Sequence, residues 1–192
     1  LHLCDRRQRQ MCIRDRVWLV ALFCCHNVLF AQKEFVNASA RLSGHPRILL
    51  QKGEEKALKK VIMKDAVWKD IHQSLVDEAG EIVKLPLNER IKTGRRLLSV
   101  SRENLRRIFI LSYAYRMTGK NEFLKRAESE MLKAASFSDW NPSHFLDVGE
   151  MTMALAIGYD WLYPQLSVQT KKEIENAIVE KGLKPSFDER YN

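Results

Sequence analysis

The sequence has few cysteines, and all of them lie near its beginning. They occupy positions 4, 12, 24 and 25, so residues 26–192 contain none. A disulfide framework and a cysteine-based metal site are therefore both excluded for that long remainder of the chain.

Glycine and proline are also scarce, with 8 and 5 occurrences in 192 residues. An all-β fold needs frequent tight turns, which these two residues supply, so this scarcity argues against one. Long apolar runs are missing as well: the run at residues 17–30 is too short to span a bilayer comfortably. With 45% hydrophobic and 29% charged residues, the composition is that of a globular protein.

Familiar cofactor motifs are absent from the sequence. It contains no P-loop, no G-x-G-x-x-G, no C-x-x-C and no H-E-x-x-H. His45, His72 and His144 are too scattered to suggest a metal site. We therefore expect no cofactor in this segment, although a metal ion remains possible in a further domain.

The first 44 residues divide into three segments. Residues 1–16 contain MCIRD, which resembles the translation of a transposon-end sequencing adapter, so we expect an adapter artefact there; a basic n-region of a signal peptide is the alternative. Residues 17–31 suit a signal peptide and residues 32–44 a linker. We expect a periplasmic or secreted protein without a stable membrane anchor after signal cleavage.

Removal of residues 1–31 leaves 27 basic and 22 acidic residues, a net charge of +5. This excess suits an anionic partner without demanding one. Export and a modest charge together argue against nucleic acid as the partner.

From residue 45 onward the apolar spacing predicts helices joined by short breaks. We expect them over residues 53–64, 66–84, 101–118, 121–135, 141–163 and 167–181, with Ser101, Asn121, Asn141 and Ser167 as N-caps. The 141–163 helix is apolar around nearly its whole circumference and should be buried, whereas its neighbours are amphipathic. Short connections predict antiparallel hairpins, and a stack of such hairpins that ends here would leave its inner face open. We therefore expect an all-α fragment.

Several stretches of residues 45–192 resemble heparinase II/III-type polysaccharide lyases. The most specific is the pair of segments at 139–151 and 156–163; another lies at 45–50, and 111–119 resembles a helix end repeated in α/α-toroid enzymes. The matching letters are DWNPSHFLDVGEM and AIGYDWLY, then HPRILL and LSYAYRMTG. The resemblance implies the N-terminal part of an incomplete α/α toroid, normally followed by a β-sandwich domain.

The resemblance also implies an activity. Such enzymes cleave uronic-acid polysaccharides, such as heparin, heparan sulfate or alginate, by β-elimination. A base removes the C5 proton while polar groups neutralise the carboxylate. Tyr191 and Asn192 resemble the approach to the catalytic motif, so the catalytic residues are expected after Asn192 and the fragment alone should be nearly inactive.

Asn141 and His144 are candidate substrate-binding residues. At the start of the 141–163 helix they would meet a uronate carboxylate, because a helix N-terminus favours anions. Asn141 would donate a hydrogen bond, and His144 would donate one or move a proton. The alternative is a simple cap and a satisfied core histidine.

Asp147, Glu150 and Asp160 are acidic residues on the same helix. Asp147 and Glu150 are neighbours at i and i+3, so they could form a catalytic pair. We favour a structural role for all three, in which buried carboxylates pair with arginines.

The stretch from residue 90 to residue 107 is strongly basic and contains one acidic residue, Glu103. A cationic wall there would attract a polyanion, and Arg95 and Arg102 are our candidates for substrate contact. The alternative is a solvated face whose arginines serve buried carboxylates.

Two rival functions remain open at this stage. One is a glycoside hydrolase on the same toroid, with Asp147 or Asp160 as general acid. The other is a helical-repeat module that binds carbohydrate or protein without catalysis.

Overall fold

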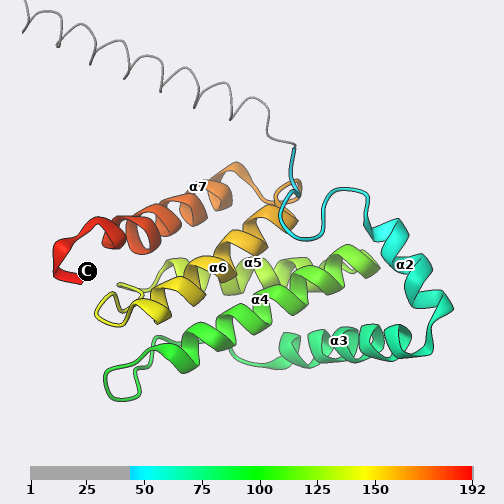
Figure 1. Ribbon diagram of the computed structural model, residues 1–192, viewed down its shortest axis with the longest axis horizontal. Helices are drawn as coiled ribbons and strands as arrows, with labels where there is room; N and C mark the ends of the chain where they lie inside the picture. The colour runs from blue at the N-terminus through cyan, green and yellow to red at the C-terminus, as the bar shows by residue number, and fades with distance from the viewer. Residues whose placement is uncertain (1–43, 192) are drawn as a thin grey trace, which may run out of the picture. The chain divides into compact units, whose positions relative to one another are not determined.

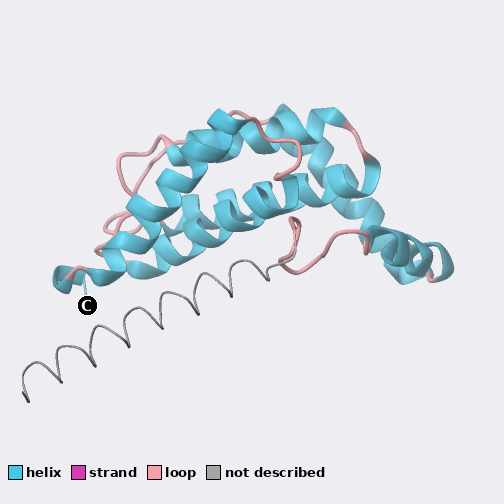
Figure 2. Ribbon diagram, turned by 90° about the horizontal axis from the view of Figure 1, so that it is seen from above, coloured by secondary structure: helices cyan, strands magenta, loops and turns pink. Residues whose placement is uncertain are grey.

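The computed structural model describes residues 44–191. The expectations for residues 1–16, 17–31 and 32–43 lie outside this range. Within it all regular structure is helical, which confirms the all-α prediction (Figures 1 and 2). The single β feature in the described part is an isolated bridge between Thr93 and Arg96.

Residues 44–191 form six α-helices followed by three short helical segments. In chain order they are α2 (Glu55–Lys64), α3 (Ala66–Lys84), α4 (Leu98–Thr118), α5 (Asn121–Ala135), α6 (Phe145–Leu162), α7 (Val168–Ala177), the π-helix η1 (Ile178–Leu183) and the 3₁₀ turns η2 (Lys184–Phe187) and η3 (Glu189–Tyr191). Among residues 44–191 no helix has both the length and the apolar character needed to cross a membrane.

Helices α4 and α6 form the most extensive helix–helix contact of the described chain. They lie side by side in Figure 1, and each buries residues on several faces. Helix α5 packs against both, while α3 packs on α4 and α7 on α5. Buried helices therefore alternate along the chain with amphipathic outer ones, as the sequence predicts.

Gly158 allows α6 to approach its neighbours closely. A Cβ atom at this position would lie 2.5 Å from Cγ2 of Ile108 on α4 and 2.6 Å from Sδ of Met131 on α5. Both neighbours are wholly buried. The missing side chain thus lets three helices meet at one point of the core.

Helix α6 begins at Phe145, four residues later than predicted. Asn141 is not its N-cap, because Asn141 has the left-handed φ of 60°, and Pro142 is not its first helical residue. An N-cap residue normally has an extended backbone. Asparagine tolerates the left-handed region, and here its side-chain amide donates to the Arg95 carbonyl and to the carboxylate of Asp147 on α6.

Helix α4 begins at Leu98, three residues earlier than predicted. Ser101 is a buried residue inside the helix, where its hydroxyl donates to the carbonyl of Leu97. The N–H of Leu97 itself donates to Asp147, 50 positions away. A cap supplied by a distant residue leaves no local signature in the sequence.

The segment that begins at His45 is attached to the end of α6. Asp160 accepts hydrogen bonds from the backbone N–H groups of Arg47 and Ile48, each at 2.8 Å, and contacts Nδ1 of His45 at 2.5 Å. The indole of Trp161 donates to the carbonyl of Ile48. Asp160 is thus a structural carboxylate that holds the start of the described chain.

Candidate functional site

Two loops meet where α6 begins, and an ion pair joins them. Arg90, in the loop before α4, places one guanidinium nitrogen 2.6 Å from Oδ1 of Asp139 and donates another hydrogen bond to the Asp139 carbonyl at 3.1 Å. Asp139 also accepts from the N–H of Asn141. Burial alone would raise the pKa of Asp139, but Arg90 and this N–H lower it overall. The region 88–97 is therefore held against the region 138–147.

Asp147 is the centre of this junction. Its carboxylate is wholly buried and accepts hydrogen bonds from the N–H of Leu97 at 2.7 Å, Nδ2 of Asn141 at 2.6 Å and Nδ1 of His144 at 2.8 Å. Burial alone would raise the pKa of Asp147, yet these three donors outweigh it and hold the pKa below its usual value. Asp147 is therefore an anion at neutral pH, held without an arginine partner.

Asn141 links the two loops through its side-chain amide. Its Nδ2 donates to the Arg95 carbonyl as well as to Asp147, and its Oδ1 accepts from Nζ of Lys92 at 3.1 Å and from Ser143 at 3.2 Å. Asn141 is 3% exposed. Because its donors are committed internally, it is suited to positioning the loops rather than to contacting a substrate carboxylate.

His144 lies at the surface of the same cluster. Its side chain is 29% exposed, and Nδ1 faces Asp147. A hydrogen bond to a carboxylate keeps the proton on Nδ1, which leaves Nε2 as the acceptor nitrogen of the neutral ring. This arrangement suits an imidazole that exchanges a proton with a ligand.

Arg102 and Arg95, the arginines predicted to contact substrate, differ in whether they have an ion-pair partner. Arg102 is 62% exposed and pairs with Glu150 at 3.1 Å, as expected for a structural Glu150. Arg95 is exposed, and its guanidinium has no ion-pair partner among residues 44–191; the same is true of Arg96. The loop beside His144 therefore carries three cationic side chains without an ion-pair partner among the described residues, Lys92, Arg95 and Arg96.

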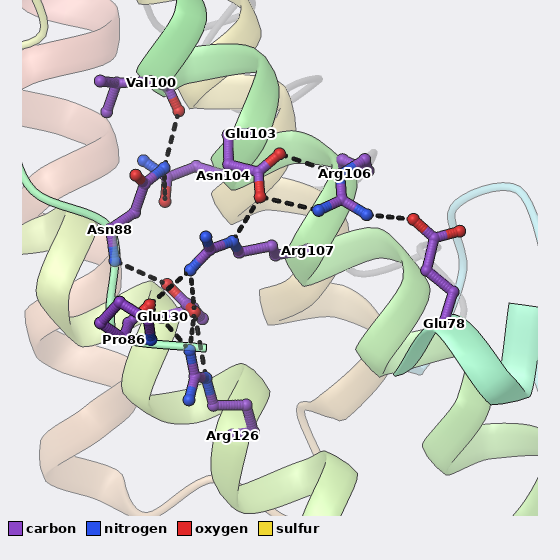
Figure 3. Close-up of polar contacts among 10 residues, drawn as sticks. All are labelled: Glu78, Pro86, Asn88, Val100, Glu103, Asn104, Arg106, Arg107, Arg126 and Glu130. Atoms are coloured by element: carbon purple, nitrogen blue, oxygen red, sulfur yellow. Dashed lines mark hydrogen bonds and ion pairs between the residues drawn. The ribbon is translucent and has the colours of Figure 1, made fainter. Parts of the chain in front are cut away.

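Two other arginines of the basic stretch pair with glutamates. Arg107 is buried and pairs with Glu103 at 2.6 Å and Glu130 at 3.1 Å, while Arg106 pairs with Glu103 and Glu78 (Figure 3). The hydrogen bonds from Arg106 are the main cause that lowers the pKa of Glu103. Arg107 therefore serves the buried carboxylate of Glu130, as the alternative interpretation of this stretch expects, whereas Arg106 pairs with partly exposed glutamates.

Glu130 is the acceptor that the sequence interpretation missed. Its side chain is wholly buried. It accepts hydrogen bonds from the Arg107 guanidinium, from Nε and a terminal nitrogen of Arg126, and from the backbone N–H of Asn88 (Figure 3). Arg107 and Arg126 also donate to the Pro86 carbonyl. A signal was present, because Glu130 shares its helix face with Ala127 and Ala134, both buried.

Comparison with known protein families finds no family that matches this chain, and no curated protein matches it. Among the described residues no group of three or more His, Cys, Asp or Glu side chains is placed to hold a metal ion.

Proposed function

We propose that this chain is the N-terminal part of the helical toroid of an exported polysaccharide lyase of heparinase II/III type. Its substrate would be a uronic-acid polysaccharide, cleaved by β-elimination. The resemblance of residues 139–163 motivates the proposal. The alternation of buried and outer helices from α4 to α7 is in keeping with it.

The observation that carries the proposal is the pairing of an oriented histidine with uncompensated cations. Asp147 orients the ring of His144, and Arg95 lies in a loop that Asn141 holds in place. In β-elimination the uronate carboxylate must be neutralised while the C5 proton leaves. Arg95 would bind that carboxylate, and Nε2 of His144 would accept or return a proton.

Asp147 would support this chemistry through its hydrogen bond with Nδ1 of His144. A buried carboxylate on Nδ1 sets the tautomer and stabilises the ring when it becomes positively charged. Asn141 would act as a positioning residue because its amide is already occupied. We expect the chain to bind polymer but not to cleave it, since the resemblance places the main catalytic groups after Asn192.

The hydrolase alternative is less well supported. A general acid needs access to the glycosidic oxygen and a raised pKa. Asp147 is wholly buried with a lowered pKa, and Asp160 is 1% exposed and occupied by His45 and two backbone N–H groups. Neither carboxylate meets those requirements.

Binding of defined polymers tests the proposal. The chain would be titrated with heparin and alginate, and compared with Arg95→Gln/Arg96→Gln and with the control Lys125→Gln/Lys172→Gln, which removes two exposed lysines elsewhere. We expect about a tenfold loss of affinity for the arginine pair and less than about twofold for the control, because a charged hydrogen bond contributes about 1.5–3 kcal/mol. Equal losses would contradict a localised site.

Product analysis is the second part of the test, and because the chain alone should not cleave the polymer, the expected result for it is no product. Elimination leaves a C4–C5 double bond that absorbs ultraviolet light, whereas hydrolysis yields new reducing ends without it. New reducing ends without the double bond would overturn the lyase assignment in favour of a hydrolase.

A further inference from the structure

Helices α2 and α3 enclose a groove that the site at the start of α6 does not use. Its cavity volume is about 420 Å³, within the range of about 300–1,000 Å³ typical of small-molecule sites. The residues that line it are Lys59, Ile62, Met63, Lys69, His72 and Gln73.

The groove follows from the helical register. Lys59, Ile62 and Met63 are spaced i, i+3, i+4 on α2, so they share one face of that helix. On α3 the same spacing relates Lys69, His72 and Gln73. Asp65 alone joins the two helices, and it caps α3 by accepting from two backbone N–H groups.

The charge of the lining is positive and uncompensated. Lys59 and Lys69 have no ion-pair partner among residues 44–191, and no carboxylate lines the groove. Gln73 donates from Nε2 to Asp77, which does not line the groove, at 2.7 Å. That bond leaves the Gln73 carbonyl oxygen as an acceptor for a ligand hydroxyl.

His72 is oriented from the neighbouring helix. Its Nδ1 lies 3.0 Å from the hydroxyl of Tyr113 on α4, and the two rings meet edge to face. Burial raises the pKa of Tyr113, so the phenol stays neutral. Because Nδ1 is occupied, Nε2 is the nitrogen that remains for a ligand.

The apolar residues of the lining favour a ligand with an apolar surface over a bare ion. Ile62 is 8% exposed and provides a buried wall, while Met63 is 76% exposed at the rim. A sugar ring offers C–H faces to such residues, hydroxyls to an amide, and carboxylate or sulfate groups to lysines.

We propose that the α2–α3 groove binds one acidic sugar unit, with its carboxylate or sulfate between Lys59 and Lys69. The choice of an acidic saccharide as ligand rests on the proposed function. This second site is separate from the first: the α2–α3 hairpin lies toward the end of α4, whereas Arg95 precedes its start (Figure 1). Tyr113 follows Leu98 by roughly 20 Å along the helix.

Matched double variants test the groove. Lys59→Gln/Lys69→Gln removes both lining charges, and Lys56→Gln/Lys60→Gln removes two exposed lysines of α2 outside the lining. Binding of a heparin tetrasaccharide, which carries sulfates, and of an alginate tetrasaccharide, which carries carboxylates alone, would be measured by calorimetry. Circular dichroism would confirm that each variant is folded.

We expect the lining variant to lose about tenfold in affinity for at least one tetrasaccharide, and the control less than about threefold. The preferred tetrasaccharide identifies sulfate or carboxylate as the group bound. In the wild-type chain the imidazole NMR signals of His72 should shift on binding. Equal losses in the two variants, or an unshifted His72, would overturn the proposal.

The failure of this inference is distinguishable from failure of the proposed function. Arg95→Gln/Arg96→Gln reports on the first site and leaves the groove intact. If Arg95→Gln/Arg96→Gln binds normally while Lys59→Gln/Lys69→Gln does not, the proposal for the groove is supported and the proposed site at the start of α6 is contradicted. The reverse result removes the groove and leaves the proposed function in place.

Discussion

Nδ1 of His144 lies 2.8 Å from Oδ1 of Asp147, and Oδ2 of the same carboxylate lies 2.7 Å from the backbone nitrogen of Leu97. One buried carboxylate therefore orients a surface imidazole and caps α4 at the same time. The consequence is a coupling between site and fold, because whatever disturbs Asp147 also loosens the start of α4.

Asp147→Asn should destabilise the protein by about 2–4 kcal/mol. Leu97 and Asn141 both donate to Oδ2 and His144 contacts Oδ1, so the new amide nitrogen faces donors in either orientation, and the negative charge that all three groups share is lost. Urea unfolding measures the loss. The matched control is Asp70→Asn on the exposed side of α3, which we expect to change stability by less than about 0.5 kcal/mol. A loss as small as that of the control would show that Asp147 does not tie the loops together.

The pH dependence of stability should carry the signature of Asp147. Its pKa is lowered in the folded state from an ordinary 3.8, so the unfolded state binds more protons in acid. The stabilisation is complete above pH ~4 and disappears as the pH falls through the lower folded-state value.

The unfolding free energy of Asp147→Asn should accordingly fall less than that of the wild type from pH ~5 to pH ~2. Asp139, Glu103 and Glu55 also have lowered pKa values, so both proteins should lose stability in acid. The difference between the two curves isolates Asp147. Parallel curves would mean that its folded-state pKa is not lowered.

Much of the helical architecture was predictable because it depends on local chemistry. Ser167 caps α7 through its side-chain oxygen, and Gly119 ends α4 in the left-handed conformation, both as predicted. The predicted cap Asn121 is instead the first residue of α5, whose N-cap is Lys120. Hydrophobic spacing located α3, which matches its predicted bounds of 66–84. Each of these features is encoded within a few residues of the place where it acts.

The errors occurred where a distant residue decides the local structure. Leu97 caps α4 only because Asp147 reaches it, and Asn141 leaves the helix because its amide bonds to Arg95 and Asp147. For the candidate site, the sequence singled out His144 as a substrate-binding residue and Asp147 as a structural partner of arginines, but their contact with each other was not predicted. The partner of Arg107, Glu130, was missed because its contacts span three segments of chain.

Glu130→Gln should be among the most destabilising single substitutions, at about 3–5 kcal/mol. It leaves the guanidinium groups of Arg107 and Arg126 buried beside a neutral amide. Glu122→Gln on the same helix is the control, and since Glu122 is exposed we expect about 1 kcal/mol or less. Thermal or urea unfolding compares the two. Similar values for both would show that the network in Figure 3 contributes little to stability.

Two glycines of α6 should respond to alanine in opposite directions. At Gly158 a Cβ atom would lie 2.5 Å from Ile108 and 2.6 Å from Met131, so Gly158→Ala must move side chains in a packed core. We expect a loss of about 1–3 kcal/mol. At Gly149 a Cβ atom would meet nothing within 4 Å, and there Ala should stabilise the helix by about 0.5–1 kcal/mol. Because the two substitutions are chemically identical and lie on one helix, their difference in unfolding free energy measures the close approach of α4, α5 and α6; if both variants gain stability, the helices are not packed as tightly at Gly158 as the structure shows.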